Sequence, residues 1–122
     1  MTPKFRAYDG GSLSRMYQPD EVMVGNGDIW IIDEDSVAGD WIVNNDLHLM
    51  QSTGLKDKNG KEIFEGDVVK CNGLLGTIKS LKAMWICSFV KYNNYQKVGF
   101  FAQEIEVVGN IYENPELLED KE

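Results

Sequence analysis

Apolar and polar residues alternate in short runs along this chain of 122 residues, and Gly, Asn and Asp separate the runs. The first run, from Lys4 to Tyr8, places Phe5 and Ala7 on one face of a predicted strand, because successive side chains of a strand point to opposite faces. No long window keeps the 3.6-residue period of an amphipathic helix. The pattern therefore predicts a mainly β protein.

The N-terminal region contains a clear turn signal. Asn26-Gly27 lies between the apolar runs Val22–Val24 and Ile29–Ile32, and an Asn-Gly pair supplies the positive φ angles that a tight hairpin needs. We therefore expect a hairpin here. The following stretch, residues 33–46, is rich in acidic and small residues, which predicts an exposed connection interrupted by a short apolar segment at Trp41–Val43.

The second half of the chain has the spacing of a small barrel. Asn59-Gly60 predicts another turn, Ile63-Phe64 an apolar anchor, and Gly66-Asp67 the entry to a strand that begins at Val68. Closing a sheet of short strands into a barrel removes its exposed edges. We expect an SH3-like small barrel built from this strand and four more at Gly76–Leu81, Met84–Val90, Lys97–Ala102 and Val107–Tyr112.

The C-terminus has the features of a helix start. Asn114 precedes Pro115, and Asn at the N-cap followed by Pro at the first helical position predicts a short C-terminal helix over 115–119. A change in composition near Ser52 divides the chain into an N-terminal β-rich region, residues 1–52, and the barrel region, residues 53–122. The two regions could also form one integrated domain.

Three separated motifs resemble those of the YopX family. They occur in the expected order at Lys4–Asp9, Leu49–Val69 and Val108–Leu118. The resemblance implies a phage or prophage origin and an SH3-type barrel in the C-terminal part. It carries over no catalytic residue and no molecular role, and it matches no motif between Ser12 and Leu47.

The charge balance narrows the range of functions. The chain has 20 acidic and 12 basic residues, a net charge of -8, which counts against nucleic-acid binding because that affinity comes largely from Lys and Arg. No stretch is long and apolar enough to span a membrane, and the N-terminus lacks the apolar segment of a secretion signal, so we expect a cytoplasmic protein. Cys71 and Cys87 are expected to be reduced core residues.

The sequence offers little for catalysis or metal binding. His48 is the single histidine, and although Asp46 could lie on the same strand face, no nucleophile signature accompanies the pair. One His and two distant Cys do not make a zinc site, and the acidic residues at 33–35 lack the pattern of an EF-hand loop. We therefore predict a protein without cofactors that is not an enzyme.

One basic region departs from the acidic average. No acidic residue occurs from Cys71 to Gln103, while Trp85, Cys87 and Phe89 share the parity expected for the core. That parity predicts outward positions for the residues between them. The candidate interaction surface comprises Lys79, Lys82, Ile86, Val90, Lys91, Tyr92, Tyr95 and Lys97.

Two uses of this surface remain open. Outward apolar and aromatic side chains are typical of protein interfaces, which favours a homo-oligomer or binding to a phage or host protein. Its lysines together with its tyrosines could instead bind a single-stranded nucleic acid by charge and stacking. We take protein association as the first hypothesis and nucleic-acid binding as the alternative.

Overall fold

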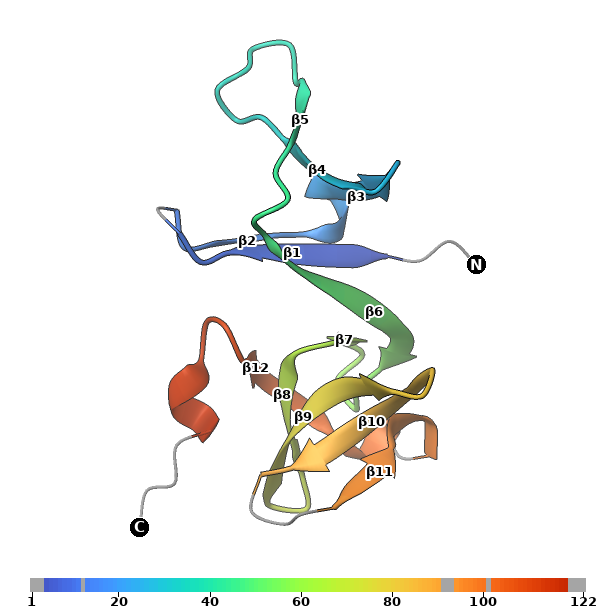
Figure 1. The fold of residues 1–122 in the computed structure, drawn as a ribbon. Coiled ribbons are helices and arrows are strands. Elements are labelled where there is room, and N and C mark those ends of the chain that lie inside the picture. The colour runs from blue at the N-terminus through green and yellow to red at the C-terminus, as the bar shows by residue number, and fades with distance from the viewer. Residues whose placement is uncertain (1–3, 12, 91–93, 101, 119–122) are drawn as a thin grey trace. The chain divides into compact units, whose positions relative to one another are not determined.

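The computed structural model describes residues 4–11, 13–90, 94–100 and 102–118 (Figure 1). It is mainly β, as the alternating pattern predicts, and its helical segments are short 3-10 turns. The chain divides into two compact units, residues 1–51 and residues 52–122, which we call the N-terminal and C-terminal units. Each is described by itself below.

Two antiparallel groups of strands form the N-terminal unit. In the first, β1 pairs with β2 on one side and with the first half of β6 on the other. In the second, β4 lies between β3 and β5. The elements are β1 (Phe5–Asp9), β2 (Arg15–Tyr17), η1 (Pro19–Glu21), β3 (Val22–Gly25), β4 (Asp28–Ile32), β5 (Trp41–Val43) and β6 (His48–Lys56).

The predicted hairpin at Asn26-Gly27 is confirmed. Gly25 pairs with Asp28, so Asn26 and Gly27 alone form the loop, and both have the positive φ of a type I′ turn, 53° and 80°. The core of the unit collects apolar side chains from both strand groups. Its buried members are Ala7, Tyr17, Val22, Ile31 and Leu47, with Phe5, Ile29 and Leu49 packed against them.

A five-stranded antiparallel sheet dominates the C-terminal unit, in the order β11-β10-β9-β8-β12 (Figure 1). The elements of this unit after β6 are β7 (Glu62–Phe64), β8 (Asp67–Cys71), β9 (Leu74–Leu81), β10 (Met84–Phe89), β11 (Tyr95–Lys97), η2 (Val98–Phe100), η3 (Ala102–Glu104), β12 (Glu106–Asn110) and η4 (Pro115–Leu118). β7 pairs with the second half of β6. A closed SH3-like barrel stays a prediction, since β11 and β12 end the strand order.

The inner face of this sheet carries the larger core. Its buried members are Ile63, Val69, Cys71, Ile78, Cys87, Val98, Ala102, Ile105 and Val107, with Leu55, Trp85 and Phe89 packed against them. Trp85 and Phe89 therefore face the core, as their parity predicts. Gly76 makes room for a neighbour, because a Cβ built there would lie 2.4 Å from the Cys87 Sγ and 3.0 Å from the Ser88 carbonyl oxygen.

The predicted strand at Lys97–Ala102 is wrong beyond its first residue. Strand β11 ends at Lys97, and the chain continues through the 3-10 turns η2 and η3. Among the residues whose burial is described from 98 to 105, the buried ones are Val98, Ala102 and Ile105, spaced four and three residues apart, which is a helical rather than an alternating period. The β-branched and aromatic composition of the segment concealed that spacing.

The expected C-terminal helix is present as η4, a single 3-10 turn that starts at Pro115. The side chain of Asn114 does not follow the capping role that its position suggests. Its Oδ1 accepts a hydrogen bond of 3.1 Å from the Asn110 backbone N–H, so it ties η4 back to the end of β12. The backbone carbonyl of Asn114 accepts the first bond of the turn, from the Leu117 N–H.

Candidate interaction surfaces

Three residues of the candidate surface form one row across the C-terminal sheet. Ile86 on β10 is directly opposite Lys79 on β9 and Lys97 on β11. Residues that are opposite each other in an antiparallel pair point to the same face. This face is the reverse of the one that carries Cys87 and the core, and we call the row of Lys79, Ile86 and Lys97 the basic row.

Ile86 does not supply the exposed apolar contact that the sequence suggests, so this part of the prediction is wrong. It lies on the expected face but is 5% exposed. The exposed Lys79 and Lys97 lie on either side of it, and Val68 and Thr77, which share this face, are buried as well. The basic row therefore presents two charges rather than an apolar patch.

The other predicted members are distributed differently. Tyr95 pairs with Ser88 on the same face as the basic row and is 53% exposed, and Val90 is 43% exposed just beyond β10. Lys82 lies in the tight turn between β9 and β10, with a positive φ of 50°, away from the row. Lys91 and Tyr92 lie outside the described residues.

A second surface, in the N-terminal unit, was missed by the sequence interpretation. Strand pairing aligns Met23 with Trp30 and Val43, and Ile32 with Trp41. These five side chains share one face of the β3-β4-β5 sheet, the reverse of the face whose Val22 and Ile31 enter the core. We call this set the β3–β5 apolar face. Met23 and Val43 are 46% and 42% exposed, and the other three are half-buried.

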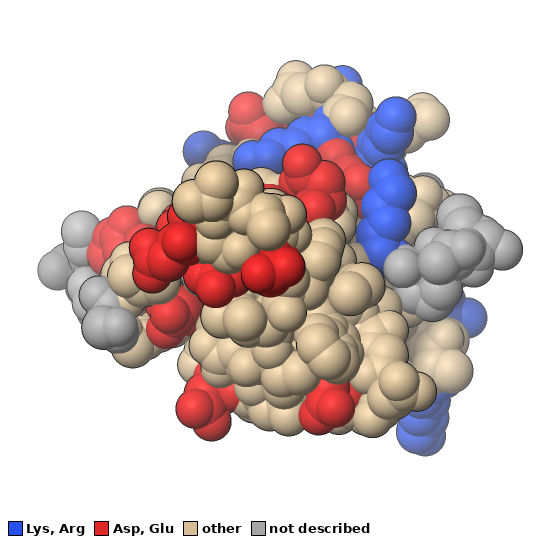
Figure 2. Space-filling view, turned by 90° about the horizontal axis from the view of Figure 1, so that it is seen from above, with Lys and Arg blue, Asp and Glu red and all other residues tan. Residues whose placement is uncertain are grey.

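An acidic connection borders this apolar face. Residues 33–40 join Ile32 to Trp41, and the Asp33 backbone N–H donates a 2.8 Å hydrogen bond to the Asp40 carbonyl at its base. Figure 2 looks down on this end of the unit and shows acidic side chains around a projection of uncharged residues. Counted over the sequence, residues 1–51 contain nine acidic and three basic side chains, a net charge of -6. An apolar face beside such a border suits a partner that is both apolar and basic.

The sequence does not predict the β3–β5 apolar face, because the face forms only when its three strands pair. β3 and β5 are short, and each contributes one or two residues to the face, so no single segment looks unusual in the sequence. The one available signal is in β4, where Ile29, Trp30, Ile31 and Ile32 make both faces of the strand apolar. A strand that is apolar on both faces is typical of a sheet that is covered on both sides.

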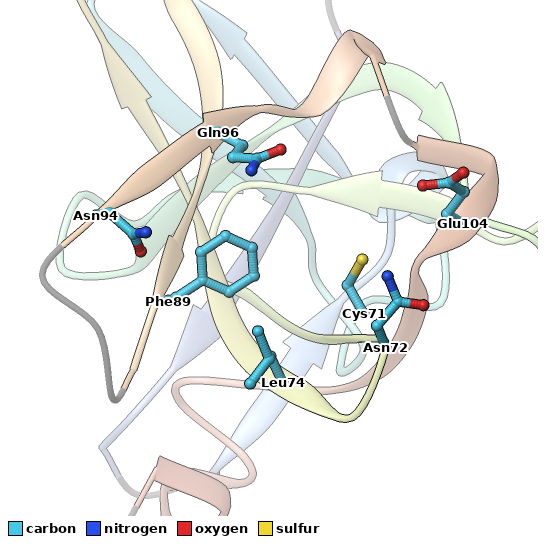
Figure 3. Close-up of a pocket in the computed structure, with 7 residues that line it drawn as sticks. All are labelled: Cys71, Asn72, Leu74, Phe89, Asn94, Gln96 and Glu104. Carbon is cyan, nitrogen blue, oxygen red and sulfur yellow. The ribbon is translucent and has the colours of Figure 1, made fainter.

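The C-terminal unit also contains an open pocket of about 220 Å³. Figure 3 shows the Phe89 ring and the Cys71 thiol directed toward this space, with Gln96 on β11 across from Leu74 at the start of β9. The described lining residues are Cys71, Asn72, Leu74, Phe89, Asn94, Gln96 and Glu104. Burial and the nearby Glu104 carboxylate raise the pKa of the Cys71 thiol, and burial with Cys71 as neighbour raises the pKa of Cys87 to about 11. Both thiols are therefore protonated and unreactive near neutral pH.

Asp57, in the most recognisable segment of the chain, has a structural role. The side chain is 4% exposed, and its Oδ1 accepts hydrogen bonds of 2.9 Å from the backbone N–H groups of Asn59 and Lys61. Its Oδ2 accepts one of 2.9 Å from Val107, fifty residues away. Burial alone would raise the pKa of this carboxyl, but the three N–H donors and the Lys61 charge lower it below its ordinary value.

The sequence offers His48 and Asp46 as the nearest approach to a catalytic pair, and the structure shows where they lie. His48 is exposed and lies opposite Tyr8 in the β1–β6 pairing, while the Asp46 backbone N–H bonds to the Asn44 side chain. Within the described ranges, no group of three or more His, Cys, Asp or Glu side chains is placed to hold a metal ion. No helix in that part of the chain is long and apolar enough to cross a membrane.

Comparison with known proteins decides the family. The family model described as YopX protein matches residues 4–119, nearly the whole chain and both units. This chain belongs to the YopX family. The match includes residues 12–47, where the sequence alone offered no recognisable motif, so the N-terminal sheet and its apolar face lie inside the family domain.

Two solved structures share the fold. Protein EF1440 from Enterococcus faecalis is 28% identical, with 98% of this chain and 99% of that chain covered and a TM-score of 0.64. The yopX protein from Bacillus subtilis is 21% identical, with 95% and 98% covered and the same TM-score. No curated protein matches this chain. The comparisons thus establish the family and the fold, and neither printed description states a function.

Proposed function

We propose that this YopX-family protein is a non-enzymatic interaction module of a phage or prophage that assembles with further copies of itself or binds another phage or host protein. The observation that carries the proposal is the β3–β5 apolar face. It brings two tryptophans, an isoleucine, a methionine and a valine to one side of a sheet whose other side already packs a core. Contiguous apolar surface of this kind, rich in Trp and Met, is typical of protein interfaces.

Charge supports the same reading. The N-terminal unit carries a net charge of -6, and the basic row of the C-terminal unit offers two lysines on a face opposite to its core. An acidic border around an apolar face attracts partners with basic surfaces and speeds their association. A further copy, presenting its basic row, has suitable charge, and so does any protein with a comparable basic and apolar surface.

Paired substitutions on the same strands test the proposal. The double variant Met23→Ser/Val43→Ser removes exposed apolar side chains from the β3–β5 apolar face, and Val24→Ser/Ile42→Ser removes equally exposed ones from the reverse face. We expect the wild-type protein and the second variant to associate with rising concentration in analytical ultracentrifugation, or to capture the same partner from phage-carrying cells. The first variant should remain a monomer without partner. Identical behaviour of the two variants would refute a role for this face.

Single-stranded nucleic-acid binding is the second candidate, favoured by Tyr95 beside the basic row. Fluorescence anisotropy with labelled oligonucleotides at low salt checks it. The candidate requires that Lys79→Gln weaken binding while Lys58→Gln, an exposed lysine of the same unit outside the sheet, leaves it unchanged. The protein's overall charge of -8 opposes this activity, and we expect no binding above that of the Lys79→Gln variant.

A further inference from the structure

The pocket of the C-terminal unit has an unusual combination of lining groups. Its described lining contains one carboxylate, Glu104, the side-chain amides of Asn72, Asn94 and Gln96, and an apolar wall formed by Phe89 with Leu74. It contains neither Lys nor Arg, although this part of the sequence is otherwise basic. The basic row lies on the reverse face of the sheet. The pocket therefore offers amide donors and acceptors together with a single negative charge.

The surroundings of Cys71 show how this charge acts inside the pocket. Burial raises the pKa of the thiol, and the Glu104 charge raises it further, so the carboxylate lies close enough to disfavour a second negative charge. The same field that opposes a thiolate favours a bound cation. Anionic ligands such as phosphates or carboxylates are poorly suited to this site.

Size and shape narrow the class of cation. A volume of about 220 Å³ falls below the roughly 300–1,000 Å³ of most small-molecule sites, and matches a single side chain or a compact ligand. One wall is the half-buried ring of Phe89, and Figure 3 shows Asn94 and Gln96 on the Phe89 side of the pocket and Glu104 at its other end, beyond Cys71 and Asn72. A guanidinium is flat, stacks on aromatic rings and carries five N–H donors, whereas an ammonium is a compact, strongly hydrated point charge.

We propose that this pocket binds a guanidinium group, with Phe89 as its stacking surface, the amide oxygens of Asn94 and Gln96 as acceptors and the Glu104 carboxylate, at the other end of the pocket, as its counter-charge. The group would enter as an arginine side chain of a bound polypeptide or as a free alkylguanidine. This site shares no residue with the β3–β5 apolar face, so its test does not depend on the outcome of the test of the proposed function.

Titration of the full-length protein with matched ligands tests the chemistry. N-acetyl-arginine amide and N-acetyl-citrulline amide have nearly the same shape but differ in charge, and N-acetyl-lysine amide keeps the charge without the planar group. Followed by NMR, the arginine compound should shift the backbone amides of Asn72, Gln96 and Glu104 in a saturable way, while the other two should bind at least about fivefold more weakly. Equal shifts with the lysine compound would overturn guanidinium recognition.

Matched variants separate the pocket from the general attraction of an acidic protein for cations. Glu104→Gln should weaken binding by about fivefold, the upper range for an exposed ion pair. Glu116→Gln, which removes the same charge from η4 outside the pocket, should leave binding unchanged. Equal losses in the two variants would reduce the effect to net charge and overturn the proposal. Since Glu104 is exposed, a thermal melt should show both variants folded.

The two sources of the group are distinguished by affinity. Ethylguanidinium tests the free ligand, and a short extended peptide with one central arginine tests the polypeptide source. Tighter binding of the peptide than of ethylguanidinium, lost again when the arginine becomes citrulline, assigns the site to an arginine side chain. Equal affinities assign it to small alkylguanidines, and no saturable binding of either refutes the site.

Discussion

The two units of this protein use their sheets in opposite ways. In the C-terminal unit, nine buried residues form the core on one face of a five-stranded sheet, and the reverse face combines the exposed Lys79, Tyr95 and Lys97 with the buried Val68, Thr77 and Ile86. In the N-terminal unit, five buried residues form a smaller core, and the reverse face of its three-stranded sheet is a continuous apolar surface. The first arrangement stabilises a fold, and the second leaves apolar area available for a partner.

This difference separates family recognition from the proposed function. The segment from Thr53 to Lys70 is recognisable because its turns and anchors are fixed by structure, with Asp57 bonded to β12 and Ile63 and Phe64 buried. The region with no recognisable motif contains the β3–β5 apolar face. The recognisable architecture and the surface of the proposed function thus lie in different parts of the chain, and substitutions in each unit test that division.

The largest effect is expected from Gly76→Ala in the C-terminal core. The new methyl would lie 2.4 Å from the Cys87 Sγ and 3.0 Å from a backbone carbonyl oxygen, and the strand cannot move away without breaking its pairing with β10. Overpacking of this kind should lower the free energy of unfolding by about 2–3 kcal/mol. Urea denaturation followed by circular dichroism measures it.

Gly99→Ala is the control for this change, because a Cβ at Gly99 meets no atom within 4 Å. It should change stability far less. The double variant Gly76→Ala/Cys87→Ala should lose less than the sum of the two single changes, since removing the sulfur relieves the closest contact. Additive losses would show that the close approach of Gly76 and Cys87 is not what makes the glycine necessary.

A smaller loss is expected from Asp57→Asn. The amide keeps one acceptor but turns its NH₂ group toward a backbone N–H, so at least one of three buried hydrogen bonds is lost, at a cost of about 1–2 kcal/mol. Asp35→Asn, in the exposed acidic connection, should change stability by less than about 0.5 kcal/mol. Chemical denaturation at pH 7 compares them.

The pH dependence of the Asp57 effect has a definite sign. Its pKa is lower in the folded protein than its ordinary value of 3.8, so the stabilisation is present above pH 3.8 and is lost as the pH falls through the lowered folded pKa. The stability difference between wild type and Asp57→Asn should therefore shrink when unfolding is measured below pH 4. A difference that stays constant down to pH 2 would exclude the carboxylate as its source.

Local signals in the sequence predicted much of the fold. Turn chemistry located the Asn26-Gly27 hairpin, and alternation located most of strands β8 to β10 and their core-facing side chains. The strand predicted after Lys97 is wrong, because the Val and Phe residues of this segment favour a strand by composition while its buried positions have helical spacing.

The candidate sites were less predictable, because they depend on which residues face each other across strands. Ile86 is 5% exposed although its parity directs it away from the core, and the sequence does not show its pairing with Lys79 and Lys97. The β3–β5 apolar face assembles from three strands in the same way. Likewise, the pocket joins Glu104 from η3 to Phe89 from β10, and only the fold brings their segments together.

The smallest effect is expected in the turn that aligns the apolar face. Gly27 has a φ of 80°, and a Cβ there meets no atom within 4 Å, so Gly27→Ala adds conformational strain without a clash and should cost about 1 kcal/mol. Gly25→Ala, also free of close contacts but without positive φ, is the matched control and should be nearly neutral. Because the turn sets the register that brings Met23 opposite Trp30, Gly27→Ala should also weaken association in ultracentrifugation, whereas the more destabilising Gly76→Ala, at temperatures where it stays folded, should not. Association that follows overall stability instead of the altered unit would contradict the division of roles between the two units.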